Sequence, residues 1–220
     1  MPSDLLPFTA SRPSNEHIEI NPTVLYVGTP VALITTTNPD GSTNISPMSS
    51  AWALFDRVVL GLSSTSMGCE NLLRERHLLI NFPSSDLWPQ VEAIARATGR
   101  DPVPPHKEKI GYRFAPDKFA LCGLTPQASS LVQPPRIAEC PLQFEAEVVA
   151  CHTPGADWPE ERPEAFQIVE TKVVRVHAHP DIVLPGTNHI NTAAWQPLLY
   201  VFRHYFGIGR DLGRTFKAEE

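Results

Sequence analysis

The sequence predicts a mainly β protein, a β-barrel of antiparallel strands with short helices between them. Short apolar runs rich in β-branched residues recur along the chain, and strong turn signals separate them. The 220 residues include 23 prolines, which interrupt helices and central strands and therefore disfavour a helical bundle. Strands and helices do not alternate regularly, so a doubly wound parallel sheet is also disfavoured.

The first strands form a predicted hairpin. Residues 31–37 have the short, β-branched pattern of a buried strand, and the Asn-Pro-Asp-Gly sequence at 38–41 predicts a turn. The chain then returns through residues 42–45. Further strands are predicted over residues 51–55, 58–62, 78–82, 142–150 and 166–177. The polar, proline-rich segment 153–163 between the last two strands is expected to be an exposed loop.

Three helices are predicted outside these strands. Residues 67–76 are expected to form a short helix with Leu72 and Leu73 facing inward, and residues 85–98 a second helix. The inward face of the second helix carries Leu87, Val91 and Ile94. A third helix is predicted over residues 193–203.

The chain is predicted to divide into three parts. These are an N-terminal arm (1–22), a barrel domain (23–180) and a C-terminal extension (181–220) whose helix packs on the barrel or on a partner subunit. No apolar run approaches the ~20 residues that span a bilayer, and the N-terminus lacks a signal-peptide core. The cysteines show no CxxC spacing and are expected to be reduced, which predicts a cytoplasmic protein.

Composition and motifs exclude several classes of function. The net charge of −6 and the pI near 5.7 disfavour a nucleic-acid or anionic-membrane partner. The GxGxxG, GxxxxGK[ST], GxSxG and HExxH motifs are absent. His177 and His179 are two residues apart with no third ligand in view, so we expect strand-edge histidines in solvent rather than a metal site.

Two clusters of hydroxyl-bearing residues follow predicted strands and carry the main functional signal. Residues 63–66 precede the first predicted helix, where hydroxyls and free helix amides can bind a phosphate, and Asn71 could reach the same anion. The alternative is ordinary N-capping of that helix. Residues 44–50 can run along the edge of a flat ring, or they form a polar strand end followed by a turn at Pro47. Only the two clusters together favour a ligand with a phosphate and a ring.

This stretch resembles the flavin reductase-like family of FMN-binding split barrels, in particular the branch of nitrilotriacetate monooxygenase component B and flavoredoxin. The segments that carry the resemblance are 29–36, 38–41, 44–50, 60–64, 70–72, 79–81 and 119–125. The resemblance extends from residue 29 to 149, with a weaker echo over 195–209.

The resemblance implies a Greek-key, antiparallel six-stranded split barrel that forms a homodimer with FMN at the subunit interface. Carried over residue by residue, the isoalloxazine and ribityl would be lined by Asn44, Ser46, Met48 and Ser49. The ribityl phosphate would be held by Ser63, Ser64, Ser66 and Asn71. The expected cofactor-binding set is completed by Pro47, Ser50 and Thr65.

One departure from the family pattern concerns the phosphate. Many relatives have a lysine and a threonine where this chain has Ser66 and Gly68. The phosphate would then be bound by hydroxyls and helix amides, with Arg74 or Arg203 as a candidate cation from elsewhere. His204 and Tyr205 are candidates for covering the flavin or contacting nicotinamide, and the alternative is a packed aromatic helix face.

The function that the resemblance implies is NAD(P)H-dependent flavin oxidoreduction, with hydride transfer from nicotinamide to flavin N5. NADH and NADPH both remain open as co-substrate, and a monooxygenase component could receive the reduced flavin. One alternative keeps FMN but passes electrons to a quinone, an azo compound, a metal or a protein. Another is a non-enzymatic module that binds flavin or haem. No catalytic acid or base is assigned, because the cofactors carry this chemistry.

Overall fold

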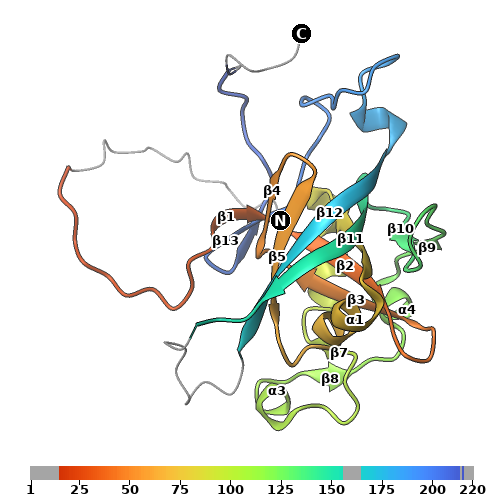
Figure 1. The fold of residues 1–220 in the computed structure, drawn as a ribbon. Helices are drawn as coiled ribbons and strands as arrows, with labels where there is room; N and C mark the ends of the chain where they lie inside the picture. The colour runs from red at the N-terminus through yellow and green to blue at the C-terminus, as the bar shows by residue number, and fades with distance from the viewer. Residues whose placement is uncertain (1–14, 156–164, 214, 216–220) are drawn as a thin grey trace, which may run out of the picture.

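The computed structural model describes residues 15–155, 165–213 and 215 (Figure 1). Its principal sheet is antiparallel and curls into a half-barrel, with strand order β3-β2-β6-β11-β12-β5-β4. The strands are β2 (Ala32–Thr37), β3 (Thr43–Met48), β4 (Ala51–Leu54), β5 (Arg57–Ser63), β6 (His77–Phe82), β11 (Leu142–His152) and β12 (Phe166–Ala178). The mainly β split-barrel prediction is therefore confirmed, with seven strands in this sheet where the family pattern implies six.

Local sequence signals explain the first half of the sheet. The predicted turn forms, with the Gly41 amide donating to the Asn38 carbonyl at 3.0 Å and Gly41 at φ +84°. The side chains of β2, the strand before this turn, alternate between two cores, so that Ile34 belongs to one core and Leu33 to the other. Both faces of β2 are covered, which holds β3 in a fixed register against it.

The helices are short. They are α1 (Met67–Glu75), η1 (Ser85–Leu87), α2 (Trp88–Ala93), α3 (Pro105–Lys109), α4 (Lys118–Cys122) and η2 (Pro180–Ile182). The first predicted helix is confirmed as α1, but Leu73 is 47% exposed, because α1 turns its Cys69 and Leu72 side toward the core. No helix in the described ranges is long and apolar enough to cross a membrane.

The second predicted helix ends earlier than expected. The inward face is confirmed, since Leu87, Val91 and Ile94 are all buried. The helix stops at Ala93, because Ala97–Thr98 forms strand β7 and pairs in parallel with β8 (Arg113–Phe114). A further small pair joins β9 (Pro126–Gln127) to β10 (Arg136–Ile137).

The helix predicted over 193–203 is wrong. This segment contains Pro197, which cannot donate a helical hydrogen bond, and continues as strands β13 (Leu199–Val201) and β14 (His204–Phe206). Phe202 and Arg203 have φ of 42° and 71° and form the turn between these strands. Strand β13 pairs with β1 (Val27–Pro30), so β13 and β14 form a three-stranded sheet with a strand from the start of the fold.

Some predicted segments are only partly described. Residues 1–14 of the predicted arm and 156–163 of the predicted loop lie outside the described residues, whereas residues 15–23 carry no strand or helix and are exposed. Cys69, Cys122 and Cys140 are buried and Cys151 is half-buried, and all four are free thiols, as predicted.

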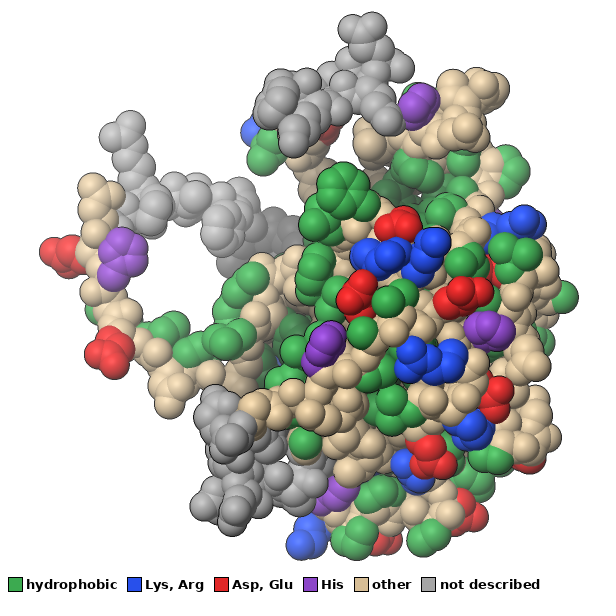
Figure 2. All heavy atoms as spheres, viewed as in Figure 1, with side chains coloured by type: hydrophobic (Ala, Val, Ile, Leu, Met, Phe, Trp, Pro, Cys, Tyr) green, Lys and Arg blue, Asp and Glu red, His purple; other side chains and the backbone are tan. Residues whose placement is uncertain are grey.

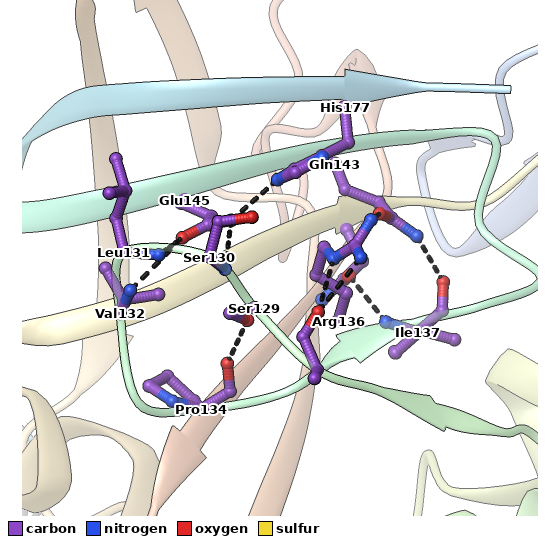
Figure 3. Close-up of polar contacts among 12 residues, drawn as sticks. Ser129, Ser130, Leu131, Val132, Pro134, Arg136, Ile137, Gln143, Glu145 and His177 are labelled. Atoms are coloured by element: carbon purple, nitrogen blue, oxygen red, sulfur yellow. Dashed lines mark hydrogen bonds and ion pairs between the residues drawn. The ribbon is translucent and has the colours of Figure 1, made fainter.

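Glu145 of β11 is the centre of a buried polar cluster that joins the loop at 129–135 to the sheet through hydrogen bonds (Figure 3). Its carboxylate accepts the amides of Ser130, Leu131 and Val132 at 2.9, 2.6 and 3.1 Å, and lies 2.6 Å from His177 Nε2. Burial raises the pKa of Glu145, but the three amides and the histidine ring outweigh it and lower the pKa to about 2.

The two histidines singled out in the sequence are therefore not free in solvent. His177 is held by the Glu145 carboxylate, and His179 Nε2 lies 2.9 Å from the Ala138 carbonyl oxygen. Among the described residues, no group of three or more His, Cys, Asp or Glu side chains could hold a metal ion.

Candidate functional site

A cavity of about 480 Å³ opens where β3, the β5–α1 connection, α2 and the β13–β14 hairpin meet. Its size lies within the range of small-molecule sites. Nine of the predicted site residues line it: Asn44, Ser46, Pro47, Met48, Ser49, Ser50, Ser63, Ser66 and Tyr205. We refer to this cavity as the cleft.

The first cluster reaches the cleft from β3 and the residues after it. Because strand side chains alternate, Asn44, Ser46 and Met48 share one side of β3, while Ile45 points into the core on the other side. Asn44 is buried, and its Nδ2 donates to Ser46 Oγ at 3.0 Å. The strand thus presents an ordered row of amide and hydroxyl groups rather than freely rotating side chains.

The second cluster lies at the amino end of α1. Ser66 caps this nine-residue helix, since its Oγ accepts the Cys69 amide at 3.1 Å and donates to the Ser63 carbonyl at 2.8 Å. Ser63 and Ser66 both line the cleft. N-capping and ligand binding are therefore compatible here, because the cap places the hydroxyls and the first helix amides beside the cavity.

Other predicted residues do not line the cleft. The Ser64 hydroxyl donates to the Ala165 carbonyl at 2.7 Å, and Thr65 Oγ1 lies 3.1 Å from Ser63 Oγ. Asn71 is fully buried, and its Nδ2 donates to Thr36 and Asn38 in the β2–β3 hairpin. His204, Arg74 and Arg203 are likewise outside the cleft lining. The structure thus separates these six residues from the nine that surround the cavity.

Two glycines make room for the polar side chains of β3. A Cβ at Gly68 would lie 2.6 Å from Ser46 Oγ, and one at Gly99 would lie 2.7 Å from Asn44 Oδ1. Neither distance is compatible with an unshifted neighbour. Because Gly68 has no side chain, α1 packs directly against the Asn44 amide and the Ser46 hydroxyl of β3.

Lys118 is the most informative site residue that the sequence analysis missed. It is only 4% exposed, lines the cleft, and donates from Nζ to Asn44 Oδ1 at 2.9 Å and to the Ile45 carbonyl at 2.7 Å. Burial, together with the charge of Lys107, lowers the pKa of Lys118 to about 8. The lysine precedes the apolar run 119–124, but its burial beside Asn44 depends on packing between residues 74 positions apart.

Tyrosines form a second wall of the cleft, which we call the tyrosine wall. Tyr200 lies between Tyr26 and Tyr205, with ring centroids 5.5 and 5.6 Å away, and Tyr112 also lines the cavity. The Tyr205 hydroxyl donates to Glu92 at 3.1 Å, and burial with this carboxylate raises the pKa of Tyr205. Only Tyr205 of this group is a candidate from sequence, because the contact of Tyr26 with Tyr200 depends on pairing between β1 and the distant β13.

The donor set of the cleft fits a flat ligand with an anionic end. One wall carries amides, hydroxyls and a helix terminus, the tyrosine wall is aromatic, and a buried ammonium lies beside Asn44. Glycines at 68 and 99 allow the backbone and β3 side chains to approach closely. An aromatic or isoalloxazine ring with a phosphate has both features that these walls complement.

Comparison with known proteins gives a consistent assignment. A family model described as "Flavin reductase like domain" matches residues 25–209. An uncharacterized protein, YdfE of Bacillus subtilis, is 46% identical over 201 residues, which are 91% of this chain and 94% of that protein. Flavoredoxin of Desulfovibrio vulgaris has a TM-score of 0.72 at 19% identity over 92% of this chain and 98% of its own. Nitrilotriacetate monooxygenase component B of Bacillus cereus has a TM-score of 0.71 at 17% identity over 91% of this chain and 100% of its own.

Proposed function

The chain belongs to the flavin reductase-like family, and from that premise we propose that it is an NAD(P)H-dependent flavin oxidoreductase with FMN in the cleft. The observation that carries the proposal is the convergence of Asn44, Ser46, Ser63, Ser66 and Lys118 on a single cavity. These residues come from three places, namely β3, the β5–α1 connection and α4. Together they offer the donors that a phosphorylated ring requires.

Each wall has a separate part in the proposed binding. The row from Ser46 to Ser50 runs along the ring edge, Asn44 reaches the ribityl chain, and the amino end of α1 with Ser63 and Ser66 receives the phosphate. The tyrosine wall supplies a stacking surface that excludes water and orients a nicotinamide over the ring, with Tyr205 as one of its members. When bound, the flavin would supply the redox chemistry by accepting a hydride at N5.

Spectroscopy tests the proposed activity. Protein loaded with FMN is expected to absorb near ~450 nm, as bound flavins do, and to lose this band when NADH or NADPH is added without oxygen. Comparison of the two nicotinamides then identifies the co-substrate. Protein that retains FMN but keeps its absorbance with both reductants would contradict the reductase proposal and leave a binding module.

The electron acceptor belongs to the same proposal. One structural neighbour is component B of a monooxygenase, which supports a role in passing reduced flavin to a monooxygenase partner.

Charges of both signs are interspersed over the face formed by β5, β11 and β12, and this face offers no broad basic surface for a nucleic acid (Figure 2). A cytoplasmic location is part of the proposal, since the four cysteines are free thiols.

The second copy of the chain is proposed to bind at the β4–β5 hairpin. Trp52, Leu54 and Phe55 are 57%, 57% and 97% exposed, and exposed apolar side chains gathered on one hairpin favour an interaction surface. A cavity of about 650 Å³ beside this hairpin shares Ser49, Ser50 and Ser63 with the cleft. A subunit that covers the hairpin would therefore also close one side of the ligand site.

Light scattering tests the homodimer. The wild-type chain is expected at twice its 24.3 kDa mass, and Phe55→Asp is expected to shift it to one chain mass, because it places a charge in an apolar interface. Ile110→Asp, at another exposed apolar position, should leave the mass unchanged. A wild-type monomer, or a Phe55→Asp dimer, would contradict the assigned surface.

A further inference from the structure

We propose that Lys118 is the cation that receives the phosphate of the bound flavin nucleotide. The inference rests on the proposed function, and it identifies a basic residue for an anion site that otherwise consists of hydroxyls and helix amides. Arg74 and Arg203 are the candidates from sequence for this role, and neither lines the cleft.

The hydrogen bonds of Lys118 leave part of its donor capacity open toward the cavity. An ammonium has three protons, and two of them are taken by Asn44 Oδ1 and the Ile45 carbonyl. Both partners are neutral, so among the described residues no carboxylate neutralises the charge. A buried, incompletely paired cation raises the free energy of the folded protein, and a ligand that brings a negative charge offsets this increase.

The position of Lys118 favours the phosphate rather than the ring. Lys118 binds Asn44, which binds Ser46, and Ser46 Oγ is so close to Gly68 in the first turn of α1 that a Cβ there would lie 2.6 Å away. This row of contacts links the ammonium to the first turn of α1. A site for a phosphate dianion results at this end, because it combines helix amides, the hydroxyls of Ser63 and Ser66, and a cation.

Arg74 is committed elsewhere, which explains why the cation comes from α4. Its Nη2 donates to the Thr37 carbonyl at 2.6 Å and to Asn71 Oδ1 at 3.0 Å, at the far side of α1. A long side chain cannot be accommodated at Gly68, where a Cβ would already lie 2.6 Å from Ser46 Oγ. Lys118 supplies the positive charge from a different element of the fold.

The binding is expected to depend on pH. The groups that face Lys118 are Lys107 of α3, Cys122 of its own helix and the neutral Asn44 and Ile45 groups of β3. A phosphate carries a charge of about −1.5 to −2 at pH 7 and would raise the pKa of Lys118 above its free value of about 8. FMN binding should therefore be strongest below pH 8, weaken as pH rises above 8, and take up protons near pH 8.5.

Substitution provides the direct test. Lys118→Met keeps the apolar stem and removes the charge, and it is expected to weaken FMN binding about 10- to 100-fold, as loss of a charged hydrogen bond does. Riboflavin, which lacks the phosphate, should bind equally well to Lys118→Met and wild type. Lys109→Met makes the same change at an exposed position of α3 and should leave FMN affinity unchanged. Lys107→Met changes the other lysine of the cleft and should have a smaller effect than Lys118→Met.

The outcomes separate the two proposals. Unchanged FMN affinity in Lys118→Met, a larger loss in Lys107→Met, or an equal loss for FMN and riboflavin would each overturn the assignment of Lys118 while leaving the proposed function standing. Wild-type protein that binds neither flavin would overturn both. Calorimetry of the wild type in buffers of different ionisation enthalpy does not depend on any variant folding. Absence of proton uptake near pH 8.5 would also overturn the assignment.

Discussion

Replacing Ser66 by Asp is expected to weaken FMN binding by about 100-fold or more without destabilising the protein. Asp is as good an N-cap as Ser, and its charge suits the amino end of α1. Ser66 lines the cleft, so the new carboxylate would lie beside the proposed phosphate position. Like charges about 4 Å apart near a protein surface repel by about 4 kcal/mol, which exceeds the loss of one hydroxyl contact.

Ser66→Asn is the matched control for this substitution. Asn caps helices as well as Asp does and has nearly the same size, but it carries no charge. Equilibrium titration should show FMN affinity close to wild type for Ser66→Asn and a large loss for Ser66→Asp, with riboflavin affinity similar in both. An equal effect of the two variants would mean that the cap region, rather than a bound phosphate, determines the change.

Replacing Glu145 by Gln is expected to lower the free energy of unfolding by about 3 kcal/mol, the scale of breaking a buried charged pair. Glu145 is fully buried and accepts three backbone amides and the His177 ring (Figure 3). A glutamine has one acceptor oxygen and would turn its own NH₂ toward donors. The melting temperature should fall by about 6–12 °C in a chain of this size.

Glu147→Gln is the control for this stability prediction. Glu147 lies on the same strand two residues further along, but it is exposed, so its neutralisation should change the melting temperature little. Equal melting temperatures for Glu145→Gln and wild type would show that the loop at 129–135 does not depend on the carboxylate.

The stabilisation by Glu145 should also depend on pH. Its pKa is about 2 in the folded protein, below the ordinary glutamate value of 4.5. A lowered folded-state pKa stabilises the protein fully above about 4.5, and that stabilisation is lost as pH falls toward 2. The difference in unfolding free energy between wild type and Glu145→Gln should therefore shrink between pH 5 and pH 3. A constant difference would contradict the cause given for the pKa.

The principal sheet could be predicted from sequence because its signals are local. Val-rich and Leu-rich runs bounded by a turn such as 38–41 fix a strand and its neighbour without reference to distant residues. The segment 193–203 lacks such a signal. Its aromatic pattern fits a helix face as well as a strand, and pairing with β1 at the other end of the chain decides between them.

The candidate site was predictable from sequence where its residues are close together in the chain. The residues on β3 and before α1 are close in sequence, so their types and spacing indicated a common site. Lys118 joins Asn44 across 74 positions, and no local pattern places it there. Ser64 and Asn71 have suitable side chains, but their neighbours, Ala165 and the β2–β3 hairpin, are also distant in sequence and use their hydrogen bonds.

A crystal structure of the protein with FMN tests the central claim most directly. The phosphate is expected within hydrogen-bonding distance of Ser63, Ser66 and Lys118, with the ring along residues 46–50 and beside the tyrosine wall. FMN bound at another surface, or in the cleft with its phosphate directed away from α1, would contradict it.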